Sequence, residues 1–89
     1  MYEWDEAKSA ATLRDRGFGF ELMEGFLWDY AICVEIQEDR GEPREKWIGP
    51  IENQLYTVII TQRSETIRII TMWQSSQAER KLWRKEFEG

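Results

Sequence analysis

Apolar residues are spaced in two ways along the chain, and the change in spacing divides it into helices and strands. Residues 6–15 and 21–27 carry apolar side chains at helical spacing, so each segment predicts a helix. Residues 31–37 alternate between apolar and polar side chains, which is typical of a half-buried strand. Residues 1–4 fit either a first edge strand or an extended lead-in.

Three more strands are predicted downstream. Residues 44–49 resume an extended pattern, and Gly49 and Pro50 are expected to end it. Residues 55–61 are apolar or β-branched on both faces, which favours a central strand covered on both sides. Residues 62–65 are short enough for a hairpin that leads into the last strand, residues 66–72.

A charged helix is predicted at the end of the chain. Ser76 followed three residues later by Glu79 is a capping-box pattern, so a helix should begin near Gln77. At about 100° per residue, the apolar side chains fall on one arc and the basic ones on the other. The apolar arc comprises Ala78, Leu82, Trp83 and Phe87, and the basic arc comprises Arg80, Lys81, Arg84 and Lys85.

These elements predict one α+β domain over residues 1–89. Every strand-to-strand connection is short enough for antiparallel pairing. We therefore expect two N-terminal helices, a four-stranded antiparallel sheet and a C-terminal helix, with the helices on one face of the sheet. Because a chain of 89 residues has a thin core, Trp4, Trp28 and Trp47 should be core or rim aromatics. The single cysteine, Cys33, is interpreted as a structural thiol in or near the core.

The composition and net charge limit the binding partners and the kinds of active site that the chain can have. The net charge of −5 disfavours a generally basic nucleic-acid binder, although six of the twelve basic residues lie at or after Arg63. The chain has no histidine, which excludes histidine-triad and zinc chemistry, and no cofactor is expected. Neither a signal-peptide region nor an apolar run of about 18 residues is present, so we expect a cytoplasmic protein without a membrane partner.

Arginine, lysine and a carboxylate can still cleave RNA without histidine. Cations hold the phosphodiester and stabilise the charge that develops on it, while a base takes the proton of the attacking 2′-hydroxyl. Arg68 interrupts an apolar strand, so it requires either a phosphate contact or a glutamate partner. Arg80 on the helix, with Lys46 and Arg63 on neighbouring strands, completes this set of candidates. The basic residues of the C-terminal helix are also consistent with a helix face that is simply exposed to solvent.

Four fragments of the chain resemble the BrnT toxins of bacterial type II toxin–antitoxin systems, which are similar in fold to RelE-type ribonucleases. YEWDEAKSAATLRDRGFGFE at residues 2–21 is similar to the family opening, and REKWIGPI at 44–51 is similar to a family strand that ends in glycine. ETIRIIT at 65–71 and AER at 78–80 follow in the family's order and spacing.

The resemblance implies a RelE-like, RNA-cleaving toxin that inhibits translation. It also implies a BrnA-like antitoxin, whose complex with the toxin binds operator DNA. Carried over by position, Arg68, Glu79 and Arg80 are the candidate catalytic residues, with Glu79 capping the helix or assisting proton transfer. Lys46, Arg63, Trp73 and Arg84 are the candidate RNA-binding residues.

The stretch after the last strand departs from the family pattern, as do residues 15–17 and 40–42. Where the family usually reads S-A-R-K-A, this chain has Thr71, Met72, Trp73, Gln74 and Ser75, so Trp73 and Gln74 replace an arginine and a lysine. A metal-independent endoribonuclease is the leading interpretation. The alternative is a catalytically degenerate relative that acts as an antitoxin-binding or regulatory partner.

Overall fold

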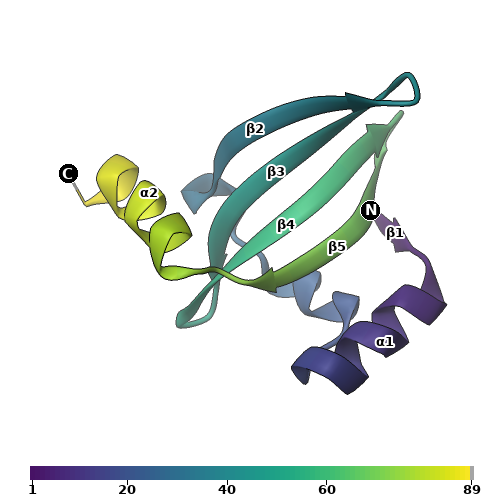
Figure 1. The fold of residues 1–89 in the computed structure, drawn as a ribbon, viewed down its shortest axis with the longest axis horizontal. Helices are drawn as coiled ribbons and strands as arrows, with labels where there is room; N and C mark the ends of the chain where they lie inside the picture. The colour runs from purple at the N-terminus through teal and green to yellow at the C-terminus, as the bar shows by residue number, and fades with distance from the viewer. Residues whose placement is uncertain (89) are drawn as a thin grey trace.

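A five-stranded mixed sheet forms the centre of the computed structural model, which describes residues 1–88 (Figure 1). Its strands are β1 (Tyr2–Trp4), β2 (Ile32–Asp39), β3 (Glu42–Ile51), β4 (Gln54–Arg63) and β5 (Thr66–Gln74). They lie in the order β1-β5-β4-β3-β2, and β1 runs parallel to β5 while the other neighbours are antiparallel. β4 is therefore the middle strand, which confirms the interpretation of residues 55–61.

The prediction of two N-terminal helices and a four-stranded antiparallel sheet is wrong. Residues 2–4 form a fifth strand, in which Tyr2 lies beside Ile67 and Trp4 beside Ile69. Residues 21–27 do not form an α-helix, because the chain makes the 3₁₀ helix η1 (Phe20–Gly25) and then a second one, η2 (Trp28–Tyr30). The five residues between Gly19 and Gly25 are too few to propagate an α-helix, and a 3₁₀ turn still directs its apolar side chains inwards.

The first face of the sheet holds the main core. Helix α1 (Glu6–Arg16) begins at Asp5, whose Oδ1 accepts from the backbone N–H of Ala7 at 2.8 Å, and ends at Gly17 with φ of 89°. The Oγ of Ser9 accepts from the backbone N–H of Phe20 at 2.8 Å and so ties α1 to η1. The buried core comprises Phe20, Met23, Phe26, Ile51, Tyr56, Val58, Ile60, Ile69 and Met72. Trp4, Trp28 and Trp47 pack against this core, as predicted.

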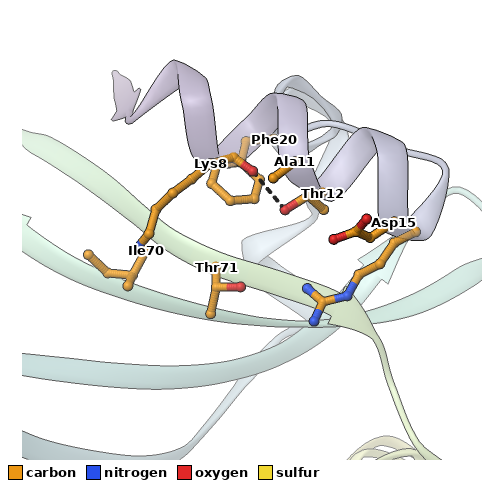
Figure 2. A pocket seen from close by; sticks show the side chains of 8 residues that line it. Lys8, Ala11, Thr12, Asp15, Phe20, Ile70 and Thr71 are labelled. Carbon is orange, nitrogen blue, oxygen red and sulfur yellow. Dashed lines mark hydrogen bonds between the residues drawn. The ribbon is translucent and has the colours of Figure 1, made fainter.

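Helix α1 also covers the edge of β5 beyond the end of β1. The pairing with β1 stops at Ile69, and further along the strand the Nη1 of Arg16 donates to the backbone oxygen of Met72 at 2.9 Å. Figure 2 shows the space between this helix and the strand, a cavity of about 230 Å³ with Lys8, Thr12 and Asp15 above and Thr71 below. Arg16 therefore occupies a backbone acceptor that would otherwise lie open on the edge of the sheet.

The second face of the sheet is only partly covered. Helix α2 (Gln77–Phe87) lies at the opposite end of the molecule from α1 and packs against β3 (Figure 1). The strand register places Ile48, Thr57 and Trp73 together on this face. Further along the same strands, Lys46 and Ile59 are only half-buried. An accessible stretch of sheet thus lies beside the first turn of α2.

Two local predictions about β2 and β3 are wrong. The register of β2 shifts between Cys33 and Glu35, so strict alternation fails there and Cys33 is exposed rather than in the core. β3 continues through Gly49 and Pro50 to Ile51 instead of ending. A Cβ at Gly49 would lie 2.7 Å from the Phe26 ring, so this glycine permits close packing and does not mark a turn.

Candidate functional site

The carboxylate of Glu79 joins the start of α2 to β3 and β5. Its Oε1 accepts from the backbone N–H of Ser76 at 2.8 Å and from the indole N–H of Trp73 at 3.1 Å. The backbone N–H of Glu79 donates in turn to the Oγ of Ser76, which completes the predicted capping box. Glu79 is therefore a helix cap and a contact with the sheet at the same time.

Lys46 provides the cation of this site. Its Nζ lies 3.3 Å from the Oε2 of Glu79 and 5.9 Å from the centre of the Trp73 ring. The Lys46 side chain is 27% exposed and that of Glu79 is 12% exposed, so the pair is accessible from one side. A cation over an indole gains about 0.5–1 kcal/mol even at an exposed position. We call Lys46, Trp73 and Glu79 the Glu79 cluster.

Two buried hydroxyl groups lie beside the Glu79 cluster. The Oγ1 of Thr57 and the Oγ of Ser75 lie 2.8 Å apart, and both residues are buried. Thr57 is paired with Trp73 across the β4–β5 ladder. The sequence interpretation missed both residues, although a threonine inside a strand covered on both faces needs a hydrogen-bond partner and could have signalled them.

Two opposing effects determine the pKa of the Glu79 carboxyl group. Burial by itself raises the pKa of the Glu79 carboxyl, but hydrogen bonds from the Ser76 backbone, Trp73, Thr57 and Lys46 outweigh burial, and the pKa lies below its usual range. The carboxylate is thus ionised at neutral pH. It can accept hydrogen bonds and hold Lys46 in place.

Replacement of Glu79 by glutamine should make the protein less stable in a pH-dependent way. Because the pKa is lowered in the folded state, the stabilisation by Glu79 is fully present above the unfolded carboxyl pKa of about 4.3 and is lost as pH falls through the folded value. Urea unfolding of both proteins from pH 7 down to pH 3 would measure this. A stability difference that stayed constant over the range would contradict the expectation.

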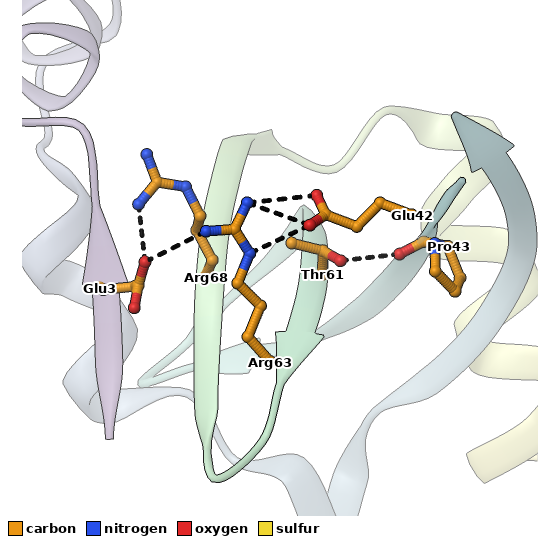
Figure 3. A network of polar contacts seen from close by, with 6 residues as sticks. All are labelled: Glu3, Glu42, Pro43, Thr61, Arg63 and Arg68. Carbon is orange, nitrogen blue, oxygen red and sulfur yellow. Dashed lines mark hydrogen bonds and ion pairs between the residues drawn. The ribbon is translucent and has the colours of Figure 1, made fainter. Parts of the chain in front are cut away.

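Arg68 and Arg63 lie away from the Glu79 cluster. Figure 3 shows both guanidinium groups beside carboxylates, with the Nη1 of Arg68 2.8 Å from the Oε2 of Glu3 and the Nη2 of Arg63 3.0 Å from the Oε2 of Glu42. Glu3 is the neighbour of Arg68 in the β1–β5 ladder. Arg68 and Trp73 are five positions apart on β5, which is roughly 16 Å along a strand.

Arg80 and Arg84 lie on another side of α2. They line a pocket of about 390 Å³ together with Asn53, Gln54 and Trp83. The predicted facing of α2 is wrong, because Ala78 and Leu82 are exposed whereas Glu79, Arg80 and Trp83 are partly buried. The Glu79 contacts and a 2.6 Å hydrogen bond from the indole of Trp83 to the backbone oxygen of Tyr30 fix this rotation of the helix. Within residues 1–88, the buried Nε of Arg80 has no hydrogen-bond partner.

The structure therefore divides the seven predicted site residues into three groups. One is the Glu79 cluster, another contains Arg63 and Arg68, and the third contains Arg80 and Arg84.

In residues 1–88 no three histidine, cysteine, aspartate or glutamate side chains are grouped as metal ligands. No helix in that part of the chain has both the length and the apolar character to cross a membrane.

Comparison with known proteins identifies the family. The model of a family described as the ribonuclease toxin BrnT of type II toxin–antitoxin systems matches residues 4–79. No curated protein matches the chain. The matched residues include the whole Glu79 cluster and end just before Arg80. Since the match extends over most of the 89 residues, the chain belongs to the BrnT family of type II toxin–antitoxin ribonuclease toxins.

Proposed function

We propose that this chain is a metal-independent endoribonuclease whose active site is the Glu79 cluster, and that it inhibits translation in the cytoplasm. Its family is one of ribonuclease toxins. The observation that supports the site is the position of Lys46, between an ionised carboxylate and an indole on the accessible part of the sheet. A cation, a proton acceptor and a stacking surface are the groups that RNA cleavage by its own 2′-hydroxyl requires.

In the proposed reaction Lys46 exchanges its partner. Its ammonium group leaves Glu79 and binds the phosphodiester, and Trp73 stacks on a neighbouring base. The freed Oε2 of Glu79 then accepts the proton of the 2′-hydroxyl. The 2′-oxygen forms a bond to phosphorus, the bond to the 5′-oxygen breaks, and the leaving oxygen takes a proton from Lys46. The products are a 2′,3′-cyclic phosphate and a free 5′-hydroxyl.

The arginine groups have secondary parts in this proposal. Arg68 and Arg63 lie along the sheet from the Glu79 cluster and would contact more distant phosphates by exchanging Glu3 and Glu42 for them. Arg80 and Arg84 would contact RNA on the other side of α2. Their positions support binding over several nucleotides rather than direct participation in bond cleavage.

The experiment that tests this function has two readouts. Induction of the chain alone should arrest growth, and the purified protein should cleave single-stranded RNA in the presence of EDTA. An RNA with 2′-O-methyl groups should resist cleavage, because the nucleophile is blocked. If the folded protein left both growth and RNA unchanged, the ribonuclease proposal would fail.

A second candidate function is binding without catalysis. The observation in its favour is that three of the five predicted cations already have acidic partners: Lys46 has Glu79, Arg68 has Glu3 and Arg63 has Glu42. Trp73 also stands where the family carries an arginine. In this case the chain would still bind its antitoxin while cleaving no RNA, which is the outcome that separates the two candidates.

A type II toxin has an antitoxin partner. We further propose that this partner is a BrnA-like protein and that only the complex binds operator DNA. The net charge of −5 supports this division, because a free acidic toxin would be repelled by DNA phosphates. A gel-shift experiment with the operator upstream of the toxin gene should show binding by the complex and none by the free chain.

A further inference from the structure

The sheet has a long open edge at β2. β2 is the last strand of the sheet order and is eight residues long, and within residues 1–88 no strand pairs with its outer side. Long open edges offer unpaired backbone groups to other chains, and soluble proteins usually shorten, charge or cover them. The bulge near Val34 interrupts β2, but residues 35–39 run in regular register with β3.

The hairpin geometry shows which backbone groups point outwards. Arg40 and Gly41, with φ of 55° and 79°, form a two-residue turn closed by the pair Asp39 and Glu42. Such a turn is closed by a hydrogen-bonded pair, and these pairs alternate with non-hydrogen-bonded ones. Ile36, three positions before Asp39, is therefore a non-hydrogen-bonded position. Its N–H and C=O face away from β3 and are available to an added strand.

The β2 edge continues into an apolar groove against α2. This groove of about 710 Å³ is lined mainly by Ala31, Ile32, Cys33, Val34, Trp47 and Leu82, with Lys85 and Glu86 at its side. Leu82 is 50% exposed, and Ile36, further along β2, is 67% exposed. Exposed apolar side chains next to an unpaired strand edge are typical of a protein-binding surface.

We propose that the outer edge of β2 and this groove bind an extended basic segment of the antitoxin, which adds a sixth strand to the sheet. This proposal depends on the function of the chain as a type II toxin. The negative charge of this edge favours a basic partner. Glu35 and Glu38 lie on β2, which carries no cation, and the whole chain has a net charge of −5. A second copy of the chain is a poor occupant, because antiparallel pairing of two β2 strands would gather four glutamates at one seam.

Hydrogen exchange of the free toxin and of its complex with the full-length antitoxin from the same operon tests the proposal. The amides of Ile36 and Glu38 should exchange at least about tenfold more slowly in the complex, because an added strand would accept hydrogen bonds from both. Protection confined to the Glu79 cluster, with unchanged exchange along β2, would overturn it.

Ile36→Pro and Ile36→Thr form a matched pair of variants that tests the outward N–H of Ile36. Ile36→Pro removes the outward N–H without removing a donor to β3, whereas Ile36→Thr keeps both the N–H and a β-branched side chain. The proline variant should weaken antitoxin binding by at least about 100-fold, and the threonine variant by less than about tenfold. If Ile36→Pro proves unfolded by circular dichroism, Leu82→Lys in the groove should give the same loss of binding.

RNA cleavage by these variants separates the two proposals. Ile36 and Leu82 lie outside the Glu79 cluster, so both variants should cleave RNA at the wild-type rate while escaping the antitoxin. Wild-type affinity in Ile36→Pro and Leu82→Lys would overturn the docking surface and leave the ribonuclease proposal intact. A wild-type chain that binds the antitoxin through β2 but cleaves no RNA would instead reject only the ribonuclease. A toxin dimer that dissociates on Ile36→Pro would assign the edge to a second copy and also overturn the proposal.

Discussion

Replacement of Lys46 by alanine is expected to lower the rate of RNA cleavage by about 100-fold or more, which is the loss typical when one preorganised group that stabilises transition-state charge is removed. Lys46 is the cation of the Glu79 cluster and lies 3.3 Å from the carboxylate. In the proposed reaction, its loss would remove the phosphate contact and the proton for the leaving oxygen. Single-turnover cleavage of a fluorescent RNA would measure the effect.

Lys81→Ala is the matched control for Lys46→Ala. Lys81 is an exposed lysine of α2 outside the cluster, so this variant loses the same charge and should retain cleavage within about threefold. Lys46→Arg keeps the charge but changes its shape and pKa, and should restore RNA binding more than turnover. Equal activity of Lys46→Ala and Lys81→Ala would mean that the Glu79 cluster is not the catalytic site.

Replacement of Phe20 by alanine is expected to destabilise the protein by about 3–5 kcal/mol, the usual cost of truncating a buried phenylalanine. Phe20 is 1% exposed, packs edge-to-face against Trp4 with ring centres 6.4 Å apart, and anchors η1 through its backbone N–H to Ser9. That loss is a large part of the total stability of a small domain. Urea unfolding followed by tryptophan fluorescence would measure it.

Phe87→Ala serves as the comparison for this stability measurement. Phe87 is 40% exposed near the end of α2 and stacks loosely on Trp83, so its truncation should cost less than about 1 kcal/mol. Similar losses for both variants would show that the aromatic contacts of α2 contribute as much as the core under α1. The difference between the two substitutions therefore tests whether the fold depends on a single core.

Local signals in the sequence predicted some elements well. The capping box at Ser76 and Glu79 needs only four neighbouring residues, and the structure contains it. The central position of β4 followed from side chains that are apolar on both faces. β1 could not be assigned in this way, because three residues carry no periodic pattern and its partner lies more than sixty residues away in β5.

The candidate site also depends on contacts between distant residues, which local sequence patterns do not predict. Glu79 could be predicted from its capping pattern, but its contact with Lys46 depends on how α2 is rotated against β3. That rotation is set by hydrogen bonds of Trp73 and Trp83, and helical periodicity alone predicted a different inward face. Likewise, the expectation that Arg68 needs either a phosphate or a glutamate was sound, and the structure supplies Glu3.

The hydrogen bond from Arg16 to the backbone oxygen of Met72 gives the two sides of the sheet different capacities for assembly. Strand-by-strand polymerisation requires that each molecule offer two complementary edges, one to receive and one to give. Within residues 1–88, one side ends in a three-residue strand, beyond which a guanidinium occupies the Met72 oxygen, while no strand pairs with the outer side of β2. If strand addition occurs at β2 as proposed, the short opposite edge favours a finite complex over a fibre.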